Sequence, residues 1–144
     1  MKKLSLAFLF FVLSACAAQT VQTTPRQRVE DTVGILLTAY QNRDLQGFME
    51  RVSASYPDKK RLQTRLMNVF FARSDIRISD VSVQTVFVRN KWRSQISFNM
   101  TFTRRIDEKQ QSRSLAKRFA VTAFFADENG EMKLSALEEE KDLL

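Results

Sequence analysis

The sequence has no histidine, one cysteine, 3 glycines and 2 prolines. Histidine is the only side chain whose ordinary pKa lies near neutral pH, and it is the commonest metal ligand. A single cysteine excludes a disulfide within the chain. With so little glycine, neither the dinucleotide-binding motif nor the P-loop motif occurs. We therefore expect no cofactor and no metal site.

The remaining composition is typical of one folded domain. The chain has 144 residues, of which 44% are hydrophobic and 27% charged, and this balance excludes disorder as the main state. The formal net charge is +7 at pH 7. A basic balance can indicate nucleic-acid binding. The export signal described next would carry the protein away from nucleic acid, so we expect no nucleic-acid partner. Anionic lipid headgroups are the more accessible partner for a basic protein at a membrane.

Residues 1–15 have the layout of a secretory signal. A short basic start is followed by an apolar run from Leu4 to Leu13, and small residues follow. The run is too short for a transmembrane helix, which needs about 20 apolar residues. The segment Leu13-Ser14-Ala15-Cys16 resembles the lipobox of bacterial lipoproteins. An ordinary signal with an incidental cysteine is the alternative.

The lipobox resemblance implies a lipid anchor at Cys16. In that family the cysteine carries diacylglycerol on its sulfur, its amine is acylated (often with palmitate), and the signal is cut just before it. More than one acyl chain anchors a protein stably. Residues 16–24 are then the lipidated cysteine and a short tether. Because Ala17 is not the aspartate that resembles an inner-membrane retention signal, the expected location is the periplasmic face of the outer membrane.

Hydrophobic spacing predicts three helices after the tether. Thr24-Pro25 is a capping pattern for a first helix near residues 25–42. Asp44 and Asp58 are expected to cap a second and a third helix. Gly34 interrupts the first helix, which predicts a close packing contact at that position.

After Ser74 the apolar period changes from helical to two. A change of parity near Ser79-Asp80 predicts a β-bulge, and Val86 and Val88 predict a second change. Residues 92–103 alternate cleanly, as a half-buried antiparallel strand does. Two further strands are expected, joined by a turn at Asn129-Gly130.

The order of elements resembles the nuclear transport factor 2-like superfamily, also called SnoaL-like. The segment AYQNRDLQGFMERVSASY, with Tyr40, Asp44, Phe48 and Tyr56, is similar to that family's first helices. VRNKWRSQISFNMTF is similar to its central hairpin, and FAVTAFFADENGEMKLSAL to its closing hairpin. The resemblance covers residues 25–137. It implies an α+β fold in which three N-terminal helices pack on a curved antiparallel sheet and form a conical pocket.

Residues 138–144 remain as an acidic tail. Its charge is opposite to that of the basic body, so we expect the tail to dock there. The superfamily contains isomerases, dehydratases, hydrolases, carriers and assembly domains, so the fold does not fix the function.

The strand positions expected to face the cone carry almost no ionisable side chain, and Lys117 at a strand end is the exception. A general base must lie within hydrogen-bonding distance of its proton. We therefore expect a protein that is not an enzyme and has no catalytic residue. The candidate pocket lining is aromatic apart from one methionine: Tyr40, Phe48, Tyr56, Trp92, Phe98, Met100, Phe102 and Phe119.

The sequence favours a lipid-anchored periplasmic envelope lipoprotein that serves as a non-catalytic binding or assembly module. Its partner would be a second copy or another envelope protein on the polar strand face. One alternative is a carrier of a small apolar ligand in the cone. Another is an atypical SnoaL-like lyase, isomerase or hydrolase that uses Tyr40, Tyr56 or Asp80.

Replacing Cys16 by serine tests the anchor. A serine hydroxyl does not replace the thiol in lipid attachment, so Cys16→Ser should leave the protein unlipidated and release it from the membrane fraction. Labelling with radioactive palmitate and membrane fractionation measure both effects. A Cys16→Ser protein that is labelled and membrane-held like the wild type would disprove the lipoprotein interpretation.

Overall fold

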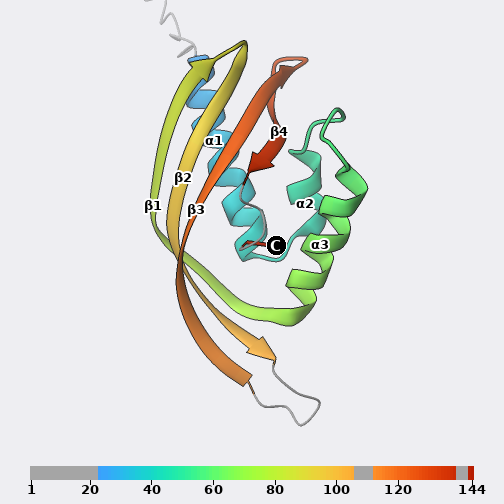
Figure 1. Ribbon diagram of the computed structural model, residues 1–144, viewed down its shortest axis with the longest axis vertical. Coiled ribbons are helices and arrows are strands. Elements are labelled where there is room, and N and C mark those ends of the chain that lie inside the picture. Colours follow the sequence, from blue (N-terminus) through green and yellow to red (C-terminus); the bar gives the residue numbers. More distant parts are fainter. Residues whose placement is uncertain (1–22, 106–111, 139–142) are drawn as a thin grey trace, which may run out of the picture.

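The computed structural model describes residues 23–105, 112–138 and 143–144. Three helices precede one antiparallel sheet, whose strand order is β1-β2-β3-β4. Figure 1 shows the long strands as one curved layer, with α1 against one side of it and with α2 and α3 beyond β4. The elements are α1 (Pro25–Gln41), α2 (Leu45–Glu50), α3 (Lys59–Ala72), β1 (Arg73–Val88), β2 (Lys91–Arg105), β3 (Ser112–Glu128) and β4 (Glu131–Glu138).

Several predictions from the sequence lie outside the described residues. These are the signal at 1–15, the lipobox with Cys16, most of the tether and the acidic residues 139–142 of the tail. In the part of the chain that is described, no helix is long and apolar enough to cross a membrane.

The helix starts are set locally, as the sequence predicts. Thr24, Asp44 and Asp58 each accept a hydrogen bond at the side-chain oxygen from the backbone N–H three residues later, over 2.9 to 3.2 Å. These bonds satisfy N–H groups that a helix cannot pair internally. Pro25 occupies the first turn of α1, where its missing N–H is not needed.

The bulge predicted in the first strand is confirmed. Its register shifts between Ser79 and Ser82, and Asp80 there has a φ of 52°. The second predicted change of parity is wrong. Pairing is regular from Ser82 to Val88, so Val86 and Val88 lie on the outer face and are exposed. The residue inserted at the bulge already exchanges the two faces for the rest of the strand. The other register shift of β1 lies earlier, between Ser74 and Arg77, where the sequence predicted none.

The apolar core lies between the inner face of the sheet and the helices. Its largest fully buried apolar side chains are Val29, Val33, Leu62, Leu66, Phe98, Met100, Phe125 and Leu134. The loop after α2 is tied to β4 by two backbone hydrogen bonds of 2.8 Å, from Ser53 N–H to the Leu134 carbonyl and from Leu134 N–H to the Arg51 carbonyl. This link holds α2 against the end of the sheet.

Both ends of α1 are fastened to the sheet. At its start, Arg28 donates to the Asp127 carboxylate over 2.9 Å and to the Gly130 carbonyl over 2.8 Å. At its end, the Gln41 side-chain oxygen accepts the backbone N–H of Ile78 over 2.8 Å. The position of α1 on the sheet is therefore fixed by polar contacts as well as by burial.

The close contact predicted at Gly34 is wrong. Gly34 is exposed, and a Cβ built there meets no atom within 4 Å. The residue therefore weakens α1 without a packing benefit.

Alanine at Gly34 should accordingly stabilise the protein by up to about 1 kcal/mol, because alanine is the better helix former. Chemical denaturation measures the change. Gly130→Ala is the matched control, since Gly130 has a φ of +84° that alanine adopts only with strain. That variant should be less stable than the wild type. A loss of stability in Gly34→Ala would contradict the open environment of Gly34.

Candidate functional site

The inner side of the sheet encloses a small cavity of about 40 Å³. Tyr40 contributes its ring to the wall, and none of the described lining residues exposes a polar atom to the cavity. The lining residues come from α1, α2, three strands and the end of the chain: Val33, Leu36, Leu37, Tyr40, Phe48, Ile96, Phe98, Val121, Ala123, Phe125, Leu134, Leu137 and Leu143. A space of this size and character holds little or no water.

Three of the eight candidate pocket residues line this cavity, namely Tyr40, Phe48 and Phe98. Five do not: Tyr56, Trp92, Met100, Phe102 and Phe119. Phe119 stacks on Phe98 at a centroid distance of 5.5 Å, and Trp92 packs on Phe87 at 5.0 Å. Phe87 is 58% exposed, so the pair that it forms with Trp92 lies at the edge of the sheet, whereas Tyr56, Met100, Phe102 and Phe119 are buried in the core. These four side chains therefore contribute to the dense packing of the interior and not to a pocket.

The sequence analysis missed the aliphatic part of the wall. Leu143 is the least expected member, because the acidic tail before it predicts docking through charge and not the burial of an apolar side chain. Its side chain is 8% exposed and lies in the wall of the cavity. The one available signal was the pair of leucines at 143–144 after that acidic run.

A hydrogen-bonded cluster joins Leu143 to the helical layer and to the sheet. The Tyr40 hydroxyl donates to the Leu143 carbonyl over 2.8 Å. Arg73 Nη1 donates to the Tyr40 hydroxyl over 2.9 Å and to the same carbonyl over 3.2 Å. The Arg73 guanidinium also lies 4.6 Å from the centre of the Phe102 ring. Two donors thus converge on one carbonyl oxygen beside an apolar cavity.

The protonation state of Tyr40 makes its hydroxyl a donor. Burial raises the pKa of Tyr40 above its ordinary value of 10.0, and the charge of Arg73 and its hydrogen bond offset only part of that rise. The hydroxyl is therefore protonated throughout the neutral pH range.

The other candidate groups lie away from the cavity. Asp80 is exposed at the bulge and accepts a hydrogen bond from the Asn99 amide over 2.7 Å. Lys117 is exposed, with its ammonium 5.1 Å from the centre of the Phe119 ring. Among the described residues, no three cysteine or carboxylate side chains gather as a metal site would require.

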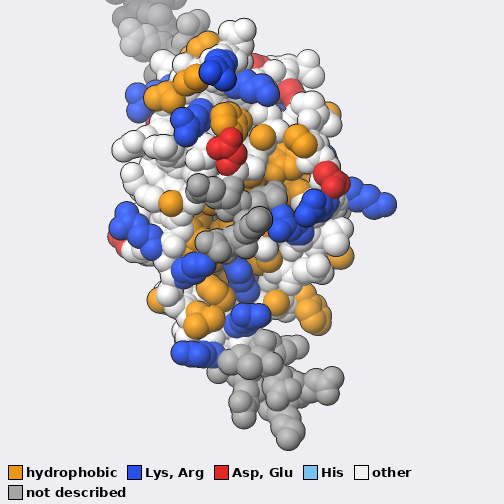
Figure 2. Space-filling view, in the orientation of Figure 1, with side chains coloured by type: hydrophobic (Ala, Val, Ile, Leu, Met, Phe, Trp, Pro, Cys, Tyr) orange, Lys and Arg blue, Asp and Glu red, His pale blue; other side chains and the backbone are white. Residues whose placement is uncertain are grey.

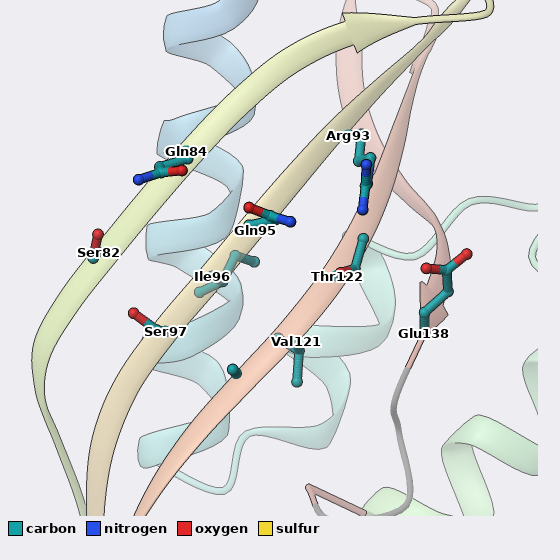
Figure 3. Close-up of a pocket in the computed structure, with 10 residues that line it drawn as sticks. Ser82, Gln84, Arg93, Gln95, Ile96, Ser97, Val121, Thr122 and Glu138 are labelled. Atoms are coloured by element: carbon teal, nitrogen blue, oxygen red, sulfur yellow. The ribbon is translucent and has the colours of Figure 1, made fainter.

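A larger hollow of about 460 Å³ lies on the outer face of the sheet. Figure 3 shows Gln84, Arg93 and Gln95 on the side of the strands away from α1, with Thr122 and Glu138 beside them. Arg93 Nε is buried there, and no described residue forms a hydrogen bond with it. Figure 2 shows lysine and arginine side chains spread over the visible surface instead of gathered in one patch.

No family model matches the sequence, and no curated protein matches it either. Solved structures do match. A "putative polyketide cyclase" from Xanthomonas campestris is 12% identical, with a TM-score of 0.58 over 83% of this chain and 96% of that one. A ketosteroid isomerase-like protein from Erwinia carotovora atroseptica is 13% identical, with a TM-score of 0.63 over 78% and 92%.

A "putative dehydratase from the NTF2-like family" of Streptomyces avermitilis is 12% identical, with a TM-score of 0.60 over 78% of this chain and 92% of that chain. The chain has the nuclear transport factor 2-like fold. The predicted fold class is therefore confirmed, with three helices before a curved antiparallel sheet.

The prediction that the protein is not an enzyme needs correction. Solved structures of this fold carry the names "putative polyketide cyclase", "ketosteroid isomerase-like protein" and "putative dehydratase", so the fold is not restricted to proteins without an enzyme's name. The lack of acids and bases on the predicted inner strand positions was too narrow a criterion. It left out Arg73, which comes from the junction of α3 and β1 and donates to the hydroxyl of Tyr40, a residue already named in the enzyme alternative.

Tyr40→Phe tests the buried hydroxyl through the pH dependence of stability. The pKa of Tyr40 is raised above 10.0 in the folded protein, so the folded state holds the phenol proton more tightly than the unfolded state does. The free energy of unfolding is therefore unchanged by this group below the unfolded pKa, and it falls as the pH rises from the unfolded pKa to the folded pKa. The wild type should therefore lose stability above about pH 10 more steeply than Tyr40→Phe. Denaturant unfolding at pH 7 and at pH 11 measures the difference. Parallel pH profiles would contradict a buried, protonated Tyr40.

Proposed function

We propose that the domain binds a small apolar molecule in the cone. The supporting observation is the composition of the cavity wall, which is made of aliphatic and aromatic side chains. The Tyr40 hydroxyl lies beside this wall, bonded to the Leu143 carbonyl. Ligand sites commonly combine an apolar wall with a few polar groups that orient the ligand. This proposal corresponds to the carrier alternative of the sequence analysis.

The volume of the cavity limits what enters without rearrangement. About 40 Å³ accommodates roughly one water molecule by its share of liquid volume. A larger ligand requires a wall side chain to move. Leu143 is the best placed to do so, because it belongs to no helix or strand and is held by side-chain donors.

A second candidate is catalysis on a carbonyl compound in the same site. The convergence of Tyr40 and Arg73 on one carbonyl oxygen favours it. Donors fixed around an oxygen stabilise negative charge that develops there during a reaction. The names of the structural neighbours are consistent with this candidate.

The envelope location is also a proposal. If Cys16 is lipidated, the nine positions 16–24 span at most roughly 30 Å, so the domain stays near the bilayer. A membrane concentrates apolar molecules, which suits a site of this chemistry. Pairing of the outer sheet face with a second copy or another envelope protein stays a prediction.

Native mass spectrometry of gently purified protein tests the binding proposal. The wild type should release an apolar molecule on denaturation. Ala123→Val, which adds two methyl groups to the cavity wall, should lose it because the added volume fills the space. Ala120→Val is the matched control, since Ala120 is exposed and its register places it on the opposite face of the same strand.

The control variant should retain the molecule like the wild type. Saturation with the hydrocarbon 2-methylpentane, followed by NMR of the wall methyl groups, covers the case in which purification strips the ligand. A ligand-free mass together with unshifted methyl signals in the wild type would refute the proposal.

A further inference from the structure

Leu143 occupies the site in the manner of a ligand. Its isobutyl group is buried in the cavity wall, and its carbonyl oxygen accepts hydrogen bonds from Tyr40 and Arg73. It reaches this position from the far end of the sequence, 103 residues from Tyr40. In Figure 1 the end of the described chain lies between the sheet and the helices α2 and α3.

One of the two donors at the Leu143 carbonyl, Arg73, is positively charged, although the oxygen that it binds is neutral. Arg73 is half-buried, lies over the Phe102 ring and donates to two neutral oxygens. Within the described ranges, no carboxylate forms an ion pair with it. Hydrogen bonds between a guanidinium and a carboxylate are roughly twice as strong as those between neutral groups. An anionic oxygen at the position of the Leu143 carbonyl would therefore be bound more tightly than the carbonyl itself.

The volume around the Leu143 side chain limits the size of the hydrocarbon group that a ligand could place there. Removal of a leucine side chain from a protein core leaves a cavity on the order of 150 Å³, which accepts benzene. The existing cavity of about 40 Å³ adjoins the Leu143 side chain. A departing Leu143 thus makes room for about six carbon atoms.

We propose that Leu143 is an internal substitute for the ligand, and that the site binds a small branched or cyclic apolar carboxylic acid. The acid's carboxylate takes the place of the Leu143 carbonyl between Tyr40 and Arg73, and its hydrocarbon part takes the place of the isobutyl group. This inference rests on the proposed function. It adds that the ligand carries a carboxylate, that its hydrocarbon part has about six carbon atoms, and that Leu143 competes with it for the site.

The probe is 4-methylpentanoate, which is leucine without its amino group. The comparison ligand is 4-methylpentan-1-ol, with the same skeleton and no charge. Affinities are measured by NMR titration of the full chain as wild type and as Leu143→Ser, which keeps the chain length but removes the competing apolar group. We expect 4-methylpentanoate to bind Leu143→Ser at least tenfold more tightly than the wild type, and at least tenfold more tightly than the alcohol binds.

Arg73→Gln in the Leu143→Ser chain should reduce the carboxylate's affinity to that of the alcohol. Arg77→Gln is the matched control, because it makes the same change on the same strand at an exposed position. It should leave the tenfold preference intact.

Equal affinity for the carboxylate and the alcohol would overturn this inference and leave the proposed apolar-ligand site standing. Equal affinity of Leu143→Ser and wild type would overturn the role of Leu143. If neither probe nor 2-methylpentane binds any variant, the proposed function itself fails. Should Leu143→Ser not fold, the Leu143 methyl signals of the wild type decide. They must shift on saturation with 4-methylpentanoate, and unchanged signals would overturn the inference.

Discussion

The burial of α1 against the inner face of the sheet is the contact on which the rest of the structure depends. Its apolar face, with Val29 and Val33 almost fully enclosed, forms one side of the core. Polar contacts then fix its position at both ends, through Arg28 at the turn between β3 and β4 and through Gln41 at the first strand. Because these contacts fix α1 along its axis, Tyr40 in its last turn has a defined position in the cone.

The site follows from that fixed position. Tyr40 places its ring in the apolar wall and its hydroxyl beside that wall, at the Leu143 carbonyl. Arg73, at the junction of α3 and β1, approaches the same carbonyl from another element. Buried polar groups need hydrogen-bond partners. The Tyr40 hydroxyl and Arg73 Nη1 both find one in the Leu143 carbonyl, which accepts from each of them. A ligand that displaces Leu143 must supply an acceptor in return, and this requirement is the chemical basis of selectivity at the site.

The two faces of the sheet serve different purposes. The inner face is apolar and closely packed, and Phe98 and Phe119 fill much of what the fold makes available as a cone. The outer face carries polar side chains around a broad hollow that includes Gln95 and Arg93. The alternation follows from the pleat of a strand, which points successive side chains to opposite faces.

Local features of the sequence determined the helix starts and the bulge of β1. Thr24, Asp44 and Asp58 cap their helices through bonds to residues three positions away, and the bulge at Asp80 follows from a change of apolar parity between neighbours. Only the tertiary structure decided that Gly34 faces open space, that most of the predicted pocket aromatics fill the core, and that Leu143 meets Tyr40 and Arg73. Such contacts join residues far apart in the sequence, as the separation of 103 positions between Tyr40 and Leu143 shows. They depend on how the sheet curves around α1, and no periodicity along the chain encodes that geometry.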